Sequence, residues 1–361
     1  MKLIVEKKRK IITIAVLFIV SLAALITSKY NPGFANWYTS NVYPLLVNTI
    51  GRLVGFLPFL LFEFMIYALV IAFAVSIIRT ILKVKHDKKA RPFLLYIFNI
   101  CLAASIIFFS YTFGCGINYS ADLFSDKENL TLNSYSTDAL ATVCSMLADR
   151  TNALSDSVFR NSSGDMVISN DERYEAVTSM ELLSETYSSL NGYYPLPKKM
   201  INSGLMSYQG ISGIYIPFTI EANYNNDMPD YNKPFTACHE LSHLRGFMSE
   251  DEANYIAFLA CINSESSDFN YSGYITGLSY CLSALRRADI DKYEEITASL
   301  DASVKHDLSV NSDFWNSYDG VISDMQSKVN DSYLKAHGDS DGVNSYGRMV
   351  DLIVSNYSLL D

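Results

Sequence analysis

Three long apolar segments occupy the first third of this 361-residue chain, and they restrict its fold more than any other feature. They cover about residues 11–27, 54–78 and 93–113, so each is near or above the ~18–20 residues that span a bilayer. In lipid the backbone must satisfy its own hydrogen bonds, which a single segment can do only as an α-helix. We therefore predict a membrane anchor of residues 1–113 with three transmembrane helices, and a lipid bilayer as its surroundings.

Basic residues on either side of these segments predict their orientation. The cluster at 7–10 precedes the first segment, and six basic residues lie between the second and the third, whereas only Lys29 and Arg52 lie between the first and the second. By the positive-inside rule the N-terminus is cytoplasmic, which places residues 114–361 outside the cell membrane. A cleaved signal peptide is the disfavoured alternative, because the first apolar segment exceeds ~7–15 residues and lacks a small-residue cleavage pattern.

The charge of the chain is divided between these two parts. Residues 1–113 hold 13 Lys and Arg against 3 Asp and Glu, while residues 114–361 hold 15 against 35. The strongly acidic outer domain argues against a nucleic-acid partner. Six cysteines show no spacing typical of a zinc knuckle or a redox pair, so buried free thiols are favoured over disulfides. Nothing in the sequence predicts the oligomeric state.

The outer domain has mainly helical periodicity. One segment, 213–224, is rich in β-branched and aromatic residues and predicts a strand, with Pro217 suited to a sheet edge. That strand either forms one wall of a cleft, where it can pair with an extended peptide, or only covers the core. The expected helices cover residues 136–152, 172–190, 234–245, 249–262, 274–288, 290–307, 312–337 and 345–356. The predicted fold class is therefore mainly α, with three transmembrane helices followed by a predominantly helical α+β ectodomain that has a small sheet.

The sequence His-Glu-Leu-Ser-His at 239–243 carries the chemistry. Residues four apart share one face of a helix, so His239 and His243 can bind one ion. Glu240 then lies beside the metal, where it can deprotonate a bound water. We expect Asn232 to cap this helix and Gly246 to end it. The pattern predicts a Zn²⁺ site of the zincin type in a domain that acts on a protein or peptide.

Catalytic zinc normally has a third protein ligand. Ser249 stands where a third histidine would continue the pattern, so a carboxylate from the next helix is expected, and Glu252 is chosen. Ser249 and Glu252 also form a capping box, which would use the same carboxylate for a backbone N–H. His306 and His337 are weaker candidates, since lone histidines are usually ordinary residues.

Two blocks, 236–247 and 250–254, resemble the bacterial membrane-protein family called domain of unknown function 3810. Further similar blocks are 212–222, 330–335 and 342–352, although Cys238 stands where a small residue is expected. Members of that family look like zinc metallopeptidases of the gluzincin type. The resemblance implies His239, His243 and Glu252 as zinc ligands and Glu240 as the catalytic acid and base, and it implies no substrate.

A peptidase also needs a group that stabilises the oxyanion of the attacked carbonyl. Tyr346 and Arg348 are candidates, although the same block could simply cap and pack a helix. The expected function is a membrane-anchored zinc metallopeptidase that hydrolyses an envelope or extracellular peptide. The alternative is a non-catalytic membrane sensor or receptor that keeps a structural metal site.

Overall fold

The chain divides into two units in the computed structural model, which describes residues 2–87, 91–336 and 347–357. Unit 1 comprises Met1–Ala121 and the short segment Ile216–Ile220, and unit 2 comprises Asp122–Tyr215 and Glu221–Asp361. This division lies near the expected end of the anchor at residue 113. The inclusion of Ile216–Ile220 in unit 1 has no counterpart in the sequence analysis.

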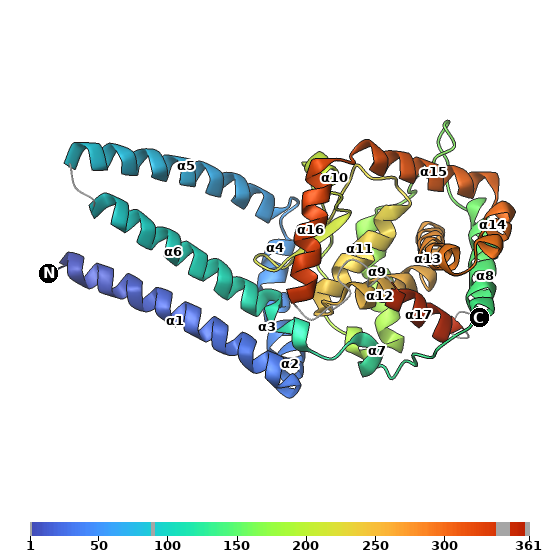
Figure 1. Cartoon of the computed structure of the whole chain (residues 1–361), viewed down its shortest axis with the longest axis horizontal. Helices are drawn as coiled ribbons and strands as arrows, with labels where there is room; N and C mark the ends of the chain where they lie inside the picture. The colour runs from blue at the N-terminus through green and yellow to red at the C-terminus, as the bar shows by residue number, and fades with distance from the viewer. Residues whose placement is uncertain (1, 88–90, 337–346, 358–361) are drawn as a thin grey trace. The chain divides into compact units, whose positions relative to one another are not determined.

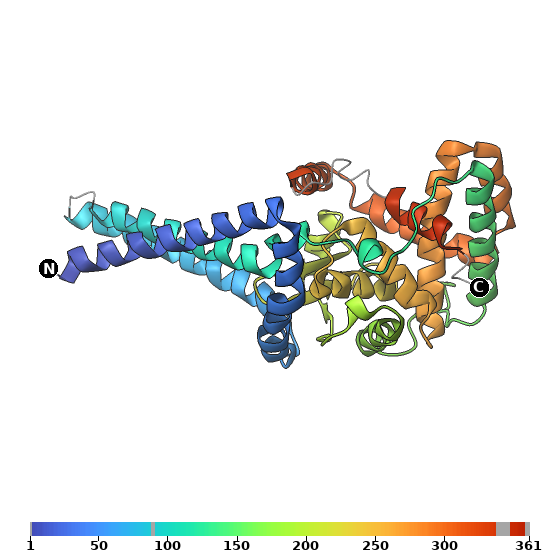
Figure 2. The same ribbon diagram turned by 90° about the horizontal axis from the view of Figure 1, so that it is seen from below.

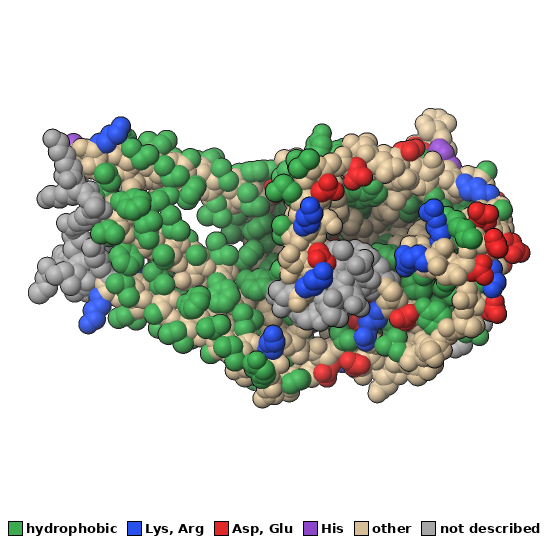
Figure 3. Space-filling view, in the orientation of Figure 1, with side chains coloured by type: hydrophobic (Ala, Val, Ile, Leu, Met, Phe, Trp, Pro, Cys, Tyr) green, Lys and Arg blue, Asp and Glu red, His purple; other side chains and the backbone are tan. Residues whose placement is uncertain are grey.

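Unit 1 is built on three long helices, α1 (Lys2–Tyr30), α5 (Leu61–Asp87) and α6 (Arg91–Tyr111). Within them, Lys8–Tyr30, Leu61–His86 and Pro92–Ser120 are long and apolar enough to cross a membrane. Hydrophobic side chains cover the visible face of these helices, with α6 between α1 and α5 (Figures 1 and 3). The chain is thus suited to a lipid bilayer, as the apolar segments predict.

The second membrane-spanning helix begins later than the sequence suggested. Residues 54–60 contain the end of a short helix and a turn through Pro58, and α5 starts only at Leu61. A proline in a turn before the helix explains the shift, since the residue preceding proline is kept out of the α conformation. Between α1 and α5 the chain forms several short helical pieces: α2 (Pro32–Trp37), η1 (Tyr38–Val42), α3 (Tyr43–Leu46), η2 (Val47–Gly51) and α4 (Arg52–Gly55).

Unit 2 is mainly helical, and its centre is formed by three consecutive helices. They are α11 (Asn232–Arg245), α12 (Glu250–Ile262) and α13 (Ser267–Ala288), whose facing side chains are almost fully buried. The helices α9 (Glu172–Thr186) and α8 (Thr137–Ser155) pack on α11 and α13 respectively (Figures 1 and 2). This core holds α11 and α12 in fixed contact, which is what positions the residues of the candidate site.

The remaining described elements surround this core. After α6, unit 1 ends with η3 (Thr112–Gly116) and η4 (Asn118–Ser120). In unit 2 the other helices are α7 (Phe124–Lys127), η5 (Ser188–Leu190), α10 (Ser203–Tyr208), α14 (Ile290–Ser299), α15 (Ala302–Ser317), α16 (Val321–Ala336) and α17 (Gly347–Ser355). The prediction of two helices at 290–307 and 312–337 is therefore wrong about where the helices are divided, because the described part of this region forms three. Extended backbone at Leu300 and Asp301 ends α14, and the turn before Gly320 separates α15 from α16.

The expected strand at 213–224 is two strands joined by a turn. The small sheet has the order β1–β3–β2, with β1 (Lys198–Lys199) parallel to β3 (Glu221–Tyr224) and β2 (Gly213–Ile216) at its edge. Pro217 lies in the turn rather than in a strand, consistent with its missing N–H donor. Among the described residues, the six cysteines form no disulfide.

Candidate metal centre

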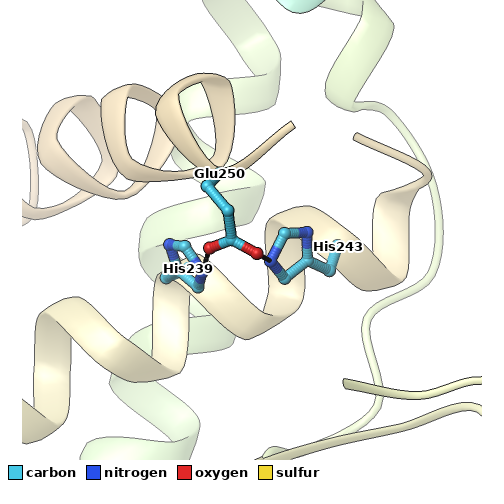
Figure 4. Close-up of side chains that lie close together, drawn as sticks. All are labelled: His239, His243 and Glu250. Carbon is cyan, nitrogen blue, oxygen red and sulfur yellow. Dashed lines mark ion pairs between the residues drawn. The ribbon is translucent and has the colours of Figure 1, made fainter. Parts of the chain in front are cut away.

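The two histidines of the motif lie one turn apart near the end of α11. Their ring centroids are 4.6 Å apart and the ring planes are nearly perpendicular, at 87°. Glu250, from the first turn of α12, points its carboxylate between them (Figure 4). Its Oε2 atom is 3.3 Å from His239 Nε2, and its Oε1 atom is 3.6 Å from His243 Nε2. These three residues form a group whose ligand atoms all lie within 4.8 Å of one another.

The end of α11 fixes the orientation of His243. Gly246 adopts the left-handed conformation, with φ 107°, that ends helices and that glycine tolerates best. The chain therefore turns back, and the Phe247 carbonyl oxygen lies 2.8 Å from His243 Nδ1. Because a carbonyl oxygen only accepts hydrogen bonds, Nδ1 carries a hydrogen, and Nε2 faces the glutamate. Such a backbone partner on the outer nitrogen is the arrangement found behind metal-bound histidines.

Glu240 is buried beside this group and is held by strand β2. The Tyr215 backbone N–H donates to its carboxylate, while its Oε2 atom has no hydrogen-bond partner among the described residues. Gly213 packs directly on it, since a Cβ atom there would overlap Glu240 Oε1 and lie 2.6 Å from Thr236 Cγ2. Burial raises the pKa of Glu240 to about 8, which favours its neutral form in the metal-free protein, whereas a cation bound beside it would favour the carboxylate.

Charges within the group are strongly coupled. Burial lowers the pKa of His239. Burial also opposes charge on His243, but the Glu250 carboxylate outweighs it and raises the pKa of His243 to about 9. Although burial favours the neutral form of Glu250, the two histidines hold its pKa well below the usual range. The group thus keeps an anionic carboxylate between two imidazoles, and a cation can take the place of the proton on His243.

Glu252, the expected third ligand, does not lie in this group. Its carboxylate is fully buried and accepts hydrogen bonds from the Ser125 backbone N–H at 2.9 Å and from Ser125 Oγ at 2.7 Å. Arg348 Nε lies 3.2 Å away and forms an ion pair with it. Ser249 begins the helix without a side-chain cap, so the capping-box alternative is not formed either. Successive residues on a helix are 100° apart, so Glu250 and Glu252 face nearly opposite sides of α12.

The other residues singled out from the sequence take separate positions. Arg348 binds Glu252 and Ser125 rather than joining the histidines. His306 pairs with Asp165 at 2.8 Å on a partly exposed surface. Tyr346 and His337 lie outside the described residues. Asn232, the expected cap of α11, is its first residue, and its side chain donates to Asn311 Oδ1 instead.

A cleft of 290 Å³ opens onto the candidate metal centre. His239, Glu250 and Asn254 contribute to its lining, and the Glu250 side chain is 30% exposed. Asn254 follows Glu250 by four residues and therefore shares its face of α12. The sequence could have favoured Glu250 over Glu252 by this spacing. Asn254, four residues after Glu250, is polar and suits a cleft, whereas Ile256, four residues after Glu252, is apolar and buried. The arrangement combines two imidazoles, one carboxylate and a buried acid at the side of an accessible cleft.

Comparison with known protein families agrees with the resemblance seen in the sequence. No curated protein and no solved structure matches the chain. One family model, described as "Protein of unknown function (DUF3810)", matches residues 38–354, which include most of unit 1 and nearly all of unit 2. The chain therefore belongs to the DUF3810 family.

Proposed function

We propose that this protein is a membrane-anchored zinc metallopeptidase whose metal ligands are His239, His243 and Glu250. The observation that carries the proposal is the position of the Glu250 carboxylate between two Nε2 atoms, at 3.3 and 3.6 Å. The two distances run to different oxygens of the carboxylate, and one ligand atom from each residue lies within 4.8 Å of the others. Ligand atoms around a tetrahedral zinc with bonds of ~2.0–2.2 Å lie about 3.3–3.6 Å apart, so a bound ion would draw the three side chains slightly closer together. The donor set of two imidazoles and one carboxylate, with a backbone partner behind His243, also suits zinc.

Glu240 supplies the acid–base chemistry of the proposed reaction. A bound Zn²⁺ supplies Lewis acidity toward water and the peptide carbonyl. The buried Glu240 carboxylate accepts a proton from the attacking water and later transfers it to the leaving amine. Its Oε2 atom is buried and has no partner among the residues the structure describes, so the proposed exchange requires a water beside the metal to reach it. Strand β2 holds the other part of the carboxylate through Tyr215 and prevents it from rotating away.

Strand β2 also supports a peptide as the substrate. It lies at the edge of the sheet and contacts Glu240 through Gly213, and the adjacent Ser212 lines the cleft. Since Glu240 already occupies the Tyr215 N–H of β2, an extended chain in the cleft would meet this edge at its start, beside Ser212, and reach the metal centre from there. With the three apolar helices as an anchor, we place the substrate among proteins or peptides at the outer face of a cell membrane.

The test uses the full-length protein in detergent or nanodiscs. We expect one zinc per chain by elemental mass spectrometry, and cleavage of at least some members of a fluorogenic peptide library. Glu240→Gln should retain the zinc and lose about 10²–10⁴-fold in kcat/KM, since a general base contributes that much.

Different results would identify other roles. Stoichiometric zinc without hydrolysis of any peptide would favour a sensor with a structural metal site, and a protein that binds no zinc would refute both functions. Glu240→Gln with unchanged turnover would remove Glu240 from the mechanism.

A further inference from the structure

The cleft extends beyond the metal centre along one face of α11. Asn232, Phe235, Thr236 and His239 all line it, at the spacing of residues that share a helix face. His239 is seven residues from Asn232, which corresponds to about 10 Å along the helix axis. This is the length of about three residues of an extended peptide. The cleft therefore has a metal end and a second end that the proposed chemistry does not use.

Aromatic side chains from three different helices line this cleft. They are Phe235 of α11, Tyr280 of α13 and Trp315 of α15. The Trp315 indole is tied to the end farthest from His239, because its Nε1 donates to Asn311 Oδ1 at 3.0 Å. The same oxygen accepts from Asn232 Nδ2 at 2.7 Å. Asn311 thus fixes the indole beside the first turn of α11.

The Trp315 indole is held in a fixed position at the surface of the cleft and is not part of the buried core. Its polar atom is satisfied within the protein, and Phe314 meets its ring edge-to-face, with centroids 5.0 Å apart. The ring remains partly exposed where it lines the cleft. In the same cleft, Thr276 Oγ1 is buried without a hydrogen-bond partner among the described residues. A fixed aromatic ring and a buried hydroxyl without a partner are what a bound peptide would use for one side chain and one backbone group.

We infer that Trp315 is a specificity-determining residue that binds an aromatic or bulky apolar side chain of the substrate, about three residues from the scissile bond. This inference rests on the proposed metal centre, because it takes His239 and Glu250 as the place of reaction. The substrates would then be peptides with an aromatic or bulky apolar residue at a fixed distance from the cleaved bond. Phe235 and Tyr280 line the same cleft.

The test uses peptide hydroxamates, which chelate zinc, on the zinc-loaded full-length protein. The probes are triglycine hydroxamate and three analogues in which Phe replaces the first, the second or the third glycine. Each probe is made in two forms, with the hydroxamate attached to the carboxyl end of the peptide or, through a malonyl unit, to its amino end. The chain has only two tryptophans, so the fluorescence of the Trp37→Phe variant reports on Trp315 alone. We expect one Phe position to bind about tenfold more tightly than triglycine and to change the indole emission.

Variants at Trp315 separate this role from a structural one. Trp315→Ala should abolish the tenfold preference for the Phe probe over triglycine hydroxamate, while Trp315→Phe should retain most of it. If all probes bind equally well, the inference is wrong and the metal centre stands. If no hydroxamate binds, the bound zinc is not open to a ligand at the cleft, and both the proposed catalytic centre and the inference are wrong. If Trp315→Ala does not fold, two measurements still test the inference. They are the change in indole emission when the Phe probe binds the Trp37→Phe variant, and the preference for that probe in Trp315→Phe.

Discussion

Two glutamates in the first turn of α12 have opposite surroundings although they are only two residues apart. Glu250 faces the imidazoles of α11, and Glu252 faces Ser125 and Arg348. We expect Glu250→Gln to lower zinc affinity at least ~100-fold, because it removes a charged ligand. Glu252→Gln should retain zinc but lower the unfolding free energy by about 2–3 kcal/mol, since it leaves a buried ion pair without its anion.

Zinc content and thermal melting of the two variants, measured side by side, check this assignment. The pair is a matched control, because both changes remove one carboxylate charge from the same turn of the same helix. Loss of zinc in Glu252→Gln and its retention in Glu250→Gln would restore the assignment made from the sequence alone.

Gly213 acts on the proposed reaction through the position of Glu240. The Cβ atom of an alanine there would overlap Glu240 Oε1 and press on Thr236, whose branched side chain has little freedom to move. Gly213→Ala should therefore displace the carboxylate and lower kcat about 10- to 100-fold, with KM and zinc content nearly unchanged.

Gly204→Ala is the control, since its Cβ would meet only Asp227 Oδ2, at an ordinary 3.9 Å. Steady-state kinetics on the best substrate of the peptide library give the comparison. Equal turnover in Gly213→Ala and the unmodified protein would mean that Glu240 does not depend on the close approach of β2.

At the scale of elements, the end of α11 is a part of the metal centre. The left-handed turn at Gly246 directs the Phe247 carbonyl to His243 Nδ1. Gly246→Ala should cost about 1–2 kcal/mol of stability, because alanine is strained at φ 107°. It should also lower zinc affinity about tenfold or more, since loss of the backbone partner frees the imidazole.

Gly164→Ala provides the matched comparison for this prediction. Gly164 also has a positive φ, of 91°, but it lies in the surface turn near His306 and not at the metal centre. Competition with a chromogenic zinc chelator should show a weakened site in Gly246→Ala only, while melting shows a similar loss of stability in both variants. If both variants bound zinc more weakly, the effect of Gly246→Ala would be explained by a general loss of stability and not by the lost backbone partner of His243.

The elements themselves show which parts of the site the sequence could predict. The helix with both histidines and its end at Gly246 follow from local rules, namely a four-residue spacing and a glycine after the last turn. The identity of the third carboxylate depends on how α12 is rotated against α11, which is a matter of tertiary packing between residues far apart in the sequence, such as Phe247 and Phe124. Ser125, which binds Glu252, is 127 residues away, and no local pattern could have revealed it.

Trp315 was missed for a similar reason. Its role depends on Asn311 meeting Asn232, 79 residues earlier in the chain, at the first turn of α11. From the sequence alone Asn232 is predicted to be a cap, because asparagine before an apolar helix usually caps it. Apolar periodicity predicts where helices lie, but it does not tell which aromatic residue of a helix faces a cleft.

At the scale of the whole molecule, the segment Ile216–Ile220 belongs to unit 1, although the chain before and after it belongs to unit 2. Dividing the chain at a single position therefore cannot separate the two units. Within unit 1, Phe218 stacks on Phe62 with centroids 5.6 Å apart, and Ile220 lies 3.3 Å from the Cβ position of Gly51. Pro217 approaches Gly114 so closely that a Cβ there would overlap its carbonyl oxygen. The turn between β2 and β3 thus belongs by its packing to unit 1, although most of β2 and all of β3 belong to unit 2.

A fragment of residues 122–361 should therefore self-associate in buffer without detergent. It lacks Phe62, Gly51 and Gly114, so Phe218 and Ile220 lose the partners that cover them, and exposed apolar groups of this kind promote association. The same fragment with Phe218→Ser and Ile220→Asn should run as a smaller species in size-exclusion chromatography with light scattering. Asparagine also suits position 220, where φ is 54°. A wild-type fragment that is monodisperse and monomeric, with melting equal to the double variant, would show that the turn needs no cover from unit 1.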